Sequence, residues 1–393
     1  MRLDLDKSAW KRVVFGDVVR NVNQTLRNPD EAGIDRIIAM EHLDPGELKI
    51  SRWGSTENGT TFIRRVTPGQ TLFGKRRAYQ RKIAYAEFAA ICSGDIYTFE
   101  ADETQMLSEF LPFLVMSNEF FDHALGTSAG SLSPRTNWRD LANFAFDLPP
   151  LDEQDRIANL LWAVESHHRA LSEERRALES ALGVFLDETY RAAEGPEVAI
   201  DSLCAHIVGG VWGSPEGEND VDVLALGPRV YASGEPELTT DGSPVRSVSE
   251  SQAASRLVRP GDIVLERSGG TFTQLVGRVV IAGDVVGACI PTDFQRLLRP
   301  AENLVEPRYL FWRLRRDWLA GVPRDYSKRT TNIANLSVKQ YLARKISLPA
   351  KDAQLEVLDR ISEFQTALAT LNDEANALGA FNSALLDMIF GGG

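Results

Sequence analysis

The 393-residue chain repeats itself at a spacing of 200 residues, and this repeat limits its possible folds more than any other feature. Over residues 148–190, ten of 43 positions carry the same residue 200 positions later. Two unrelated helices of this composition would share about three. The matches run from Leu148, which recurs as Leu348, to Asp187, which recurs as Asp387. A repeat of this length predicts a duplicated fold.

Weaker matches extend the repeat upstream. Residues 67–73 match 259–265 at a spacing of 192, and residues 110–113 match 309–312 at a spacing of 199. Chance similarity between amphipathic helices does not explain them, because the first pair is not helical. Spacings that drift in one direction are what small loop insertions would produce. The predicted parts are 1–148, 149–195, 196–348 and 349–393.

Segments 149–195 and 349–393 have the pattern of long helices. Each follows a Leu-Pro boundary and has acidic residues in its first turn, which is favourable at a helix N-terminus. Apolar residues then recur at alternating steps of three and four, the period of a coiled coil. Such a narrow stripe does not stabilise a single helix, so we expect the two helices to pair antiparallel. The positions expected in their interface are Val164, Leu171, Leu178, Phe185, Ile361, Leu368, Leu371, Leu378 and Leu385.

Segments 1–148 and 196–348 combine short β-rich runs with turns rich in Gly, Pro, Asn and Asp. One helix-like stretch follows the strands in each, at 104–124 and 306–320. The predicted fold class is therefore α+β, with two pseudo-symmetric mixed α/β domains joined by two long antiparallel helices.

Composition excludes several classes of protein. No apolar run reaches the roughly 18 residues that a membrane span needs. Three scattered cysteines form no CxxC pair, which favours a reducing cytoplasm over secretion. Five histidines without a Cys/His cluster argue against a structural zinc site. We expect a cytoplasmic protein that binds neither a membrane nor a metal ion.

The net charge of −12 is concentrated in the two helical segments. Segments 149–195 and 349–393 each carry −5, whereas 1–148 carries −2 and 196–348 carries none. An acidic mean charge therefore does not exclude nucleic-acid binding by the two mixed domains.

Cationic residues gather in two kinds of loop. Residues 64–82 hold seven Lys or Arg and no acidic residue, with aromatic side chains between them, and residues 267–270 are their counterpart. Polar loops at 130–137 and 324–332 precede the two helical segments. Arg, Lys, Asn, Ser and Thr on loops can donate to phosphates and base edges, although ordinary polar turns have the same composition. The candidate DNA-binding residues are Arg64, Arg65, Lys75, Arg76, Arg77, Tyr79, Arg81, Lys82, Arg135, Thr136, Asn137, Arg267, Ser268, Lys328, Arg329, Thr330 and Asn332.

Catalytic motifs offer little. The sequence has no Walker loop, no GxSxG, no GxGxxG and no Asn-Pro-Pro-aromatic methyltransferase motif. Asp30, Glu47 and Lys49 have the residue types of a Mg²⁺-dependent nuclease, and this remains one alternative. A protein-binding adaptor that never touches DNA is another. We predict no catalytic residue in this chain.

This organisation resembles the specificity subunit of type I restriction–modification systems. The resemblance rests on residues 148–154 (Leu-Pro-Pro-Leu-Asp-Glu-Gln) before a long helix, with 348–354 (Leu-Pro-Ala-Lys-Asp-Ala-Gln) as a second copy that differs at three positions. The strands at 68–73 and 260–265 also resemble those of the family's target-recognition domains. The similarity covers essentially the whole chain.

The resemblance implies a function. Each target-recognition domain would read one half of a split, asymmetric site in double-stranded DNA, as part of phage defence. The helices would set the spacing between the halves and dock two modification (methyltransferase) subunits, with restriction subunits as further partners. S-adenosylmethionine, ATP and Mg²⁺ would be bound by those partners, and this chain would hold no cofactor.

Overall fold

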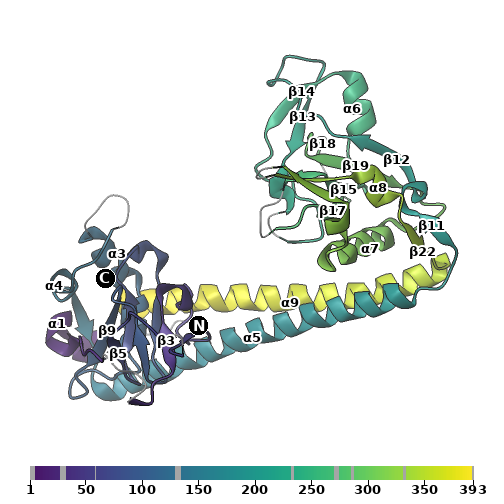
Figure 1. The fold of residues 1–393 in the computed structure, drawn as a ribbon. Coiled ribbons are helices and arrows are strands. Elements are labelled where there is room, and N and C mark those ends of the chain that lie inside the picture. Colours follow the sequence, from purple (N-terminus) through teal and green to yellow (C-terminus); the bar gives the residue numbers. More distant parts are fainter. Residues whose placement is uncertain are drawn as a thin grey trace. The chain divides into compact units, whose positions relative to one another are not determined.

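The computed structural model describes residues 5–26, 32–57, 59–128, 134–231, 234–269, 274–284, 287–330 and 333–391, without the side chains of 329 and 330. The chain forms two compact units. Unit 1 comprises Met1–Glu174 and Leu371–Gly393, and unit 2 comprises Arg175–Thr370. Each unit thus contains a mixed domain and one part of each long helix (Figure 1).

The described residues of unit 1 form three small sheets. Strand β1 (Lys11–Val14) pairs antiparallel with β10 (Ala145–Leu148). The central antiparallel sheet has the order β2 (Val19–Asn21), β9 (Ile96–Ala101), β6 (Thr71–Gly74), β7 (Ile83–Tyr85). The third has the order β4 (Gly54–Ser55), β3 (Arg36–Ile38), β8 (Ala90–Cys92), β5 (Arg64–Val66), with β3 and β8 parallel. The short helices are α1 (Phe15–Val18), α2 (Leu111–Met116), α3 (Asn118–Gly126) and α4 (Trp138–Leu141).

Unit 2 repeats this topology. Strand β11 (Glu197–Ala199) pairs with β22 (Lys345–Ser347). The central sheet has the order β12 (Cys204–Gly209), β19 (Gln295–Pro300), β15 (Ile263–Glu266), β17 (Val279–Ile281). The third has the order β14 (Val245–Val248), β13 (Val221–Leu226), β18 (Cys289–Pro291), again with one parallel pair. A further sheet is formed by β16 (Ser268–Gly269), β21 (Ile333–Leu336) and β20 (Ser327–Thr330), and the short helices are α6 (Glu250–Arg256), α7 (Pro307–Leu319) and α8 (Val338–Leu342).

The repeat extends to individual hydrogen bonds. Gln154 is fully buried, and its side chain accepts from the Leu107 N–H at 2.9 Å and donates to the Pro149 carbonyl at 2.8 Å. Gln354 makes the same two bonds, to the Glu306 N–H at 2.9 Å and the Pro349 carbonyl at 2.8 Å. The buried amide therefore fixes the start of each long helix against its own mixed domain.

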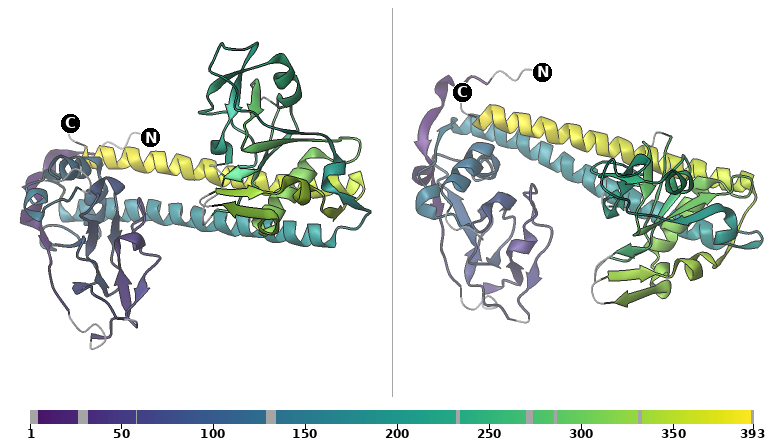
Figure 2. Two further views of the ribbon diagram at one scale, coloured as in Figure 1. Left: turned by 45° about the horizontal axis from the view of Figure 1, so that its top comes forward. Right: turned by 90° about the horizontal axis from the view of Figure 1, so that it is seen from above.

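The two long helices are α5 (Leu151–Ala192) and α9 (Lys351–Phe390). In unit 1, Ile157 and Leu161 of α5 share a core with Leu385 and Ile389 of α9. In unit 2, the Phe185 and Phe364 rings lie 5.7 Å apart, and the C-terminal part of α5 packs on the N-terminal part of α9. In both units the helices therefore run antiparallel, as predicted, and two further views show them side by side (Figure 2).

The predicted interface positions lie on the inner faces of the helices. Val164, Leu171, Ile361 and Leu385 are buried. The other five are half-buried: Leu178, Phe185, Leu368, Leu371 and Leu378.

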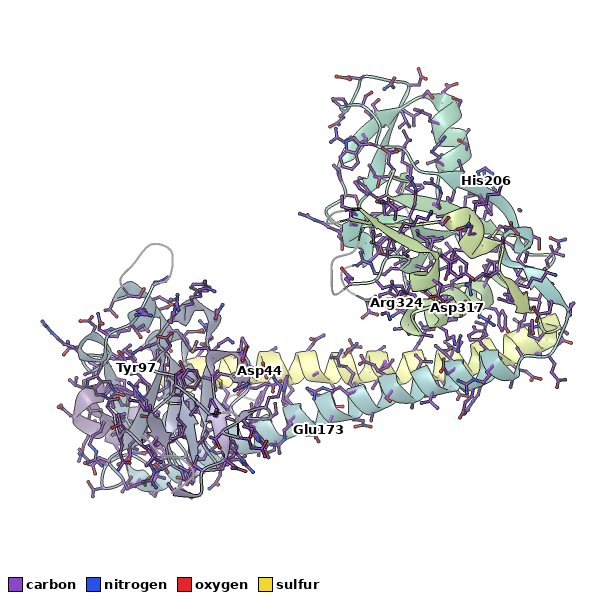
Figure 3. The ribbon with its side chains drawn as sticks, in the orientation of Figure 1. Asp44, Tyr97, Glu173, His206, Asp317 and Arg324 are labelled. Carbon is purple, nitrogen blue, oxygen red and sulfur yellow. The ribbon has the colours of Figure 1, made fainter. Side chains whose placement is uncertain are left out.

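A buried carboxylate connects α7 to the rest of unit 2. Asp317, labelled in Figure 3, is 1% exposed. Its carboxylate lies 3.3 Å from Arg313, 3.1 Å from Arg316 and 2.8 Å from Arg344. Arg316 also pairs with Asp187 on α5 at 2.7 Å. Loss of this buried acid would leave the positive charges of the three arginines without their shared partner.

The predicted helix over 104–124 is wrong as a single element. The structure breaks it at Ser117, whose extended backbone ends α2 and whose hydroxyl caps α3 by accepting the Phe120 N–H at 3.3 Å. A serine that bonds to nearby backbone favours such a break over helix continuation. The equivalent stretch of unit 2 is the single helix α7, as predicted.

Candidate nucleic-acid interface

In unit 1 the structure joins the two cationic loops that the sequence singled out. Strand β6 ends at Gly74, and the Lys75 carbonyl accepts the Thr136 N–H at 3.0 Å. Arg76 forms an antiparallel bridge with Arg135, and the Arg77 N–H donates to the Pro134 carbonyl at 2.9 Å. Residues 75–77 and 134–136 therefore form one continuous surface segment, although about 60 residues separate them in the chain.

Unit 2 contains the same junction in a more regular form. The Arg267 carbonyl accepts the Leu336 N–H at 2.7 Å, and Ser268 pairs with Asn335 in the β16–β21 ladder. Asn335 in turn pairs with Lys328 on β20. The two predicted loops of unit 2 therefore also meet, at positions that match those of unit 1 at spacings of 192 and 200.

Asp95 holds the arginine pair of unit 1. Its carboxylate lies 3.7 Å from Arg76 Nη1 and 3.4 Å from Arg135 Nη2. Its carbonyl also accepts the Lys75 N–H at 3.0 Å, which connects β9 to the junction. The side chains of Arg76 and Arg135 are 44% and 57% exposed, so both guanidinium groups are oriented by one acid and remain accessible.

The turn after this junction has an unusual backbone. Arg77 and Arg81 have φ of 55° and 50°, the left-handed region that non-glycine residues seldom adopt. They flank the short 3-10 helix Ala78–Gln80, from which Tyr79 projects with 55% of its surface exposed. The Arg81 guanidinium lies over the Phe121 ring at 4.8 Å. Backbone strain of this kind is concentrated at binding sites.

Several of the predicted cations make contacts within the domain. Arg64 donates to the Ile96 carbonyl at 2.6 Å, and Lys82 donates to the Met40 carbonyl at 2.6 Å. Arg65 buries its Nε without a hydrogen-bond partner. Lys75 lies over the Tyr97 ring at 5.1 Å, and partial burial, with Arg64 nearby, lowers its pKa. The contacts of Arg64, Lys75 and Lys82 therefore support the surface on which Arg76, Arg77, Tyr79 and Arg81 are exposed.

Two of the predicted contact residues are buried in the structure. Thr136 is 1% exposed and its hydroxyl faces the Lys75 carbonyl, and Ser268 is 8% exposed. Both side chains lie inside the junction because strand pairing turns them away from the surface. Asn137 donates to Asp140 at 3.4 Å at the start of α4. The side chains of Arg329 and Thr330, and the whole of Asn332, lie outside the described residues.

Unit 2 presents different side chains at its junction. The Phe294 carbonyl accepts the Arg267 N–H at 2.7 Å, and the Phe294 ring is 39% exposed. Arg296 lies close to Arg267, and partial burial together with that second cation lowers the pKa of Arg296. Lys328 is exposed on the neighbouring strand β20. The sequence analysis did not single out Asp95, Phe294 or Arg296. Only their position, next to the start of the long strand in each copy, could have indicated them.

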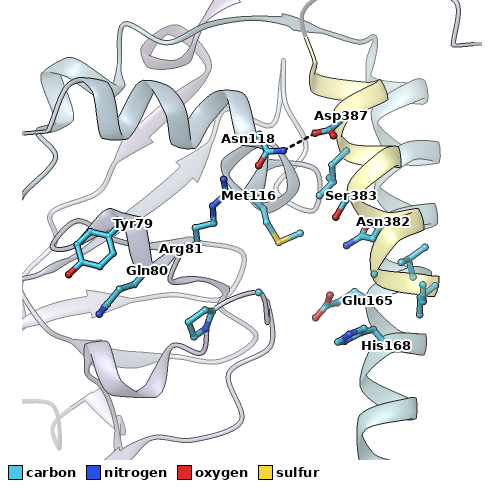
Figure 4. A pocket seen from close by; sticks show the side chains of 16 residues that line it. Tyr79, Gln80, Arg81, Met116, Asn118, Glu165, His168, Asn382, Ser383 and Asp387 are labelled. Atoms are coloured by element: carbon cyan, nitrogen blue, oxygen red, sulfur yellow. Dashed lines mark hydrogen bonds between the residues drawn. The ribbon is translucent and has the colours of Figure 1, made fainter. Parts of the chain in front are cut away.

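A pocket of about 520 Å³ lies in unit 1 between the 79–81 turn and the long helices (Figure 4). Arg81 borders it from the mixed domain, and Glu165, His168 and Asn382 border it from the helices. Glu165 accepts the Leu48 N–H at 3.4 Å, and burial raises its pKa. The turn that carries Tyr79 thus faces the helix pair across this pocket.

The nuclease alternative gains no support from the described residues. Asp30 lies outside them, and Lys49 pairs with Glu87 at 3.6 Å. Within the described ranges, no three His, Cys, Asp or Glu side chains are grouped so that they could hold a metal ion. Among the helices that the structure describes, none is both long and apolar enough to cross a membrane.

Comparisons with known proteins agree on one family of similar proteins. Residues 38–179 match the family model described as type I restriction modification DNA specificity domain. The chain is 27% identical over 150 residues to the type I restriction enzyme EcoDI specificity subunit of Escherichia coli, across 38% of this chain and 33% of that protein. It is 28% identical over 94 residues to a putative MjaX specificity subunit of Methanocaldococcus jannaschii, across 24% of this chain and 22% of that protein. The aligned stretches thus span a third or less of these curated relatives.

Solved structures share the fold. One, from a study of complex assembly and conformational transition of the type I R-M system, aligns with a TM-score of 0.59 at 21% identity and covers 97% of both chains. The S subunit of a type I restriction–modification system from M. genitalium aligns with a TM-score of 0.57 at 11% identity, covering 100% of this chain and 99% of that one. At these identities the likeness concerns the fold.

Proposed function

We propose that this chain, whose residues 38–179 match the type I restriction modification DNA specificity domain, is a specificity subunit that recognises a bipartite, asymmetric sequence in double-stranded DNA. Each unit reads one half of the site. The observation that carries the proposal is the duplicated junction: two polar loops meet at matching positions in each unit but present different side chains. A shared frame with different contacts is what two unlike half-sites require.

The contacts fall into two classes. Arg77, Tyr79 and Arg81 project from the strained turn and supply phosphate contact and stacking. Asp95 fixes both Arg76 and Arg135. Arg76, next to the turn, supplies a further phosphate contact, whereas the oriented Arg135 guanidinium can bond in bidentate fashion to guanine. In unit 2 the corresponding surface carries Arg267, Arg296 and Lys328.

The helices set the spacing between half-sites and dock partner subunits. Helix α5 is continuous from Leu151 to Ala192, and its first part belongs to unit 1 and its last part to unit 2. Each unit also exposes an apolar side chain on each helix, with Leu160 and Phe381 in unit 1 and Val184 and Leu355 in unit 2. One exposed apolar surface in each unit would dock one methyltransferase subunit, which gives two in all, with restriction subunits as further partners.

Chemistry belongs to those partners in this proposal. They would bind S-adenosylmethionine, ATP and Mg²⁺, whereas this chain is a non-catalytic reader of DNA. Incubation of the purified chain alone with DNA and Mg²⁺ tests this: cleavage lost in Asp30→Ala would instead support a nuclease.

Selection of bound duplexes from random DNA, with the methyltransferase partner present, tests the function. We expect two defined runs of base pairs separated by an unspecified gap. Arg76→Gln with Arg135→Gln should change only one run, and Arg267→Gln with Lys328→Gln only the other. A single continuous run, or changes in both runs from variants of one unit, would contradict bipartite reading. DNA association that does not respond to salt would favour the adaptor alternative.

A further inference from the structure

The duplicated frame places Asp95 of unit 1 and Phe294 of unit 2 at the same position. Each residue directly precedes the long strand of its central sheet, β9 in one unit and β19 in the other. Each carbonyl accepts the N–H of the first residue after the paired strand, from Lys75 at 3.0 Å and from Arg267 at 2.7 Å. The two carbonyls thus share this backbone role, with the Phe294 carbonyl also accepting the Ser268 N–H at 3.1 Å, whereas the two side chains differ in kind.

The two side chains have opposite chemistry. Asp95 is 27% exposed and contributes an anionic acceptor between two arginines. Phe294 is 39% exposed and contributes an apolar ring, and its carbonyl accepts the Arg267 N–H. The ion pairs with Arg76 and Arg135 account for the orientation of Asp95, but its negative charge opposes the approach of DNA phosphates. The exposed phenyl ring of Phe294 forgoes the burial that favours apolar side chains. A direct contact with bases would explain both.

The DNA major groove distinguishes base pairs by groups that match these side chains. Cytosine presents an amino donor, which a carboxylate accepts, and thymine presents a methyl group, which an apolar side chain contacts. Arginines beside an acid can donate to guanine at the neighbouring or paired position. The chemistry therefore predicts a different preference at the equivalent place in each half-site.

We propose that the position shared by Asp95 and Phe294 discriminates bases in both units: Asp95 accepts the exocyclic amino group of cytosine in one half-site, and Phe294 contacts a thymine methyl group in the other. This inference rests on the proposed function, because it assumes that each unit reads DNA. Asp95 has a second effect, since its charge restrains Arg76 and Arg135 and weakens their attraction to phosphates of any sequence.

Site selection with Asp95→Asn tests unit 1. The amide keeps the shape of the side chain but removes its charge and adds a donor. We expect about a tenfold loss of preference for cytosine at one base pair of the first run, no change in the second run, and tighter binding to unrelated DNA with a steeper dependence on salt. Asp147→Asn, which alters an acid paired with Arg12 elsewhere in unit 1, is the matched control and should leave the preference unchanged.

Thymine-to-uracil replacement tests unit 2 by removing only a methyl group. One uracil position in the second run should weaken binding of the unsubstituted protein about fourfold, the effect of one buried methyl group. In Phe294→Ala the same replacement should have no effect. Leu319→Ala, which shortens another exposed apolar side chain of unit 2, should retain the fourfold response.

The outcomes separate this inference from the function beneath it. If the unsubstituted protein selects no sequence, the proposed function fails. If it selects a bipartite site that Asp95→Asn and Phe294→Ala leave unchanged, the inference fails and the function stands. Equal weakening for all sequences would assign both residues to support of the junction, and would also overturn the inference.

Discussion

Removing the charge of the strained turn in unit 1 should weaken DNA binding in a way that salt reveals. The variant is Arg76→Gln, Arg77→Gln and Arg81→Gln, in which glutamine keeps an unbranched side chain at the left-handed positions. All three arginines are exposed. If each contacts one phosphate, the slope of log K against log salt should become shallower by about 2.7, because each contact contributes about 0.9.

The same reasoning gives the size of the affinity loss. The loss of three phosphate contacts at 0.15 M salt should raise the dissociation constant by at most about two orders of magnitude. Fluorescence anisotropy with a labelled duplex, titrated from low to high salt, measures slope and affinity together. Thermal unfolding of the same sample confirms that the domain remains folded.

A matched variant separates position from total charge. Arg12→Gln, Arg20→Gln and Arg52→Gln also removes three exposed positive charges from unit 1, from arginines that pair with Asp147, Glu100 and Asp44. Its slope should stay close to that of the unsubstituted protein. Equal slopes for the two triple variants would refute the assignment of the 76–81 turn to phosphate contact.

Three further predictions concern the helices and the packing of each unit. Deleting seven residues from α5 together with seven from α9 preserves the coiled-coil period and shortens the helix pair by about 10 Å. Site selection should then return the same two runs of base pairs, with a gap shorter by about three base pairs. An unchanged gap would contradict the spacer role. Asp317→Ala leaves three arginines without their buried acid, so it should lower the free energy of unfolding of unit 2 by about 3–5 kcal/mol in denaturant titration. The control Asp325→Ala removes an exposed acid and should lower it by less than about 0.5 kcal/mol. Burial raises the pKa of Glu165 above its ordinary value in the folded state, so the ionised form opposes folding above that pKa and the penalty disappears as the pH falls below the ordinary value. Glu165→Gln should therefore raise the midpoint of thermal unfolding at pH 7 and leave it unchanged near pH 3; an equal gain at both pH values would show that charge is not the cause.

Helices and strands of this protein follow from local patterns. The three-and-four spacing of apolar residues, the acidic first turns and the absence of proline inside the helices predict α5 and α9 from the sequence, although their stability depends on packing. The duplication could also be recognised, because Gln154 and Gln354 must satisfy the same buried backbone groups in each copy. Where a single side chain outweighed the pattern, as Ser117 does between α2 and α3, the expectation of one helix failed.

The amino-acid sequence by itself determined the repeat, the two long helices and the two groups of polar loops. The repeat is visible in residue identities, and the helices and loops follow from patterns among neighbours along the chain. Only the tertiary structure decided which of those polar side chains are presented. Strand pairing buries Thr136 and Ser268, backbone carbonyls engage Arg64 and Lys82, and Asp95 joins Arg76 to Arg135. Those contacts join residues tens of positions apart, and their geometry depends on how the sheets close, which no local pattern encodes.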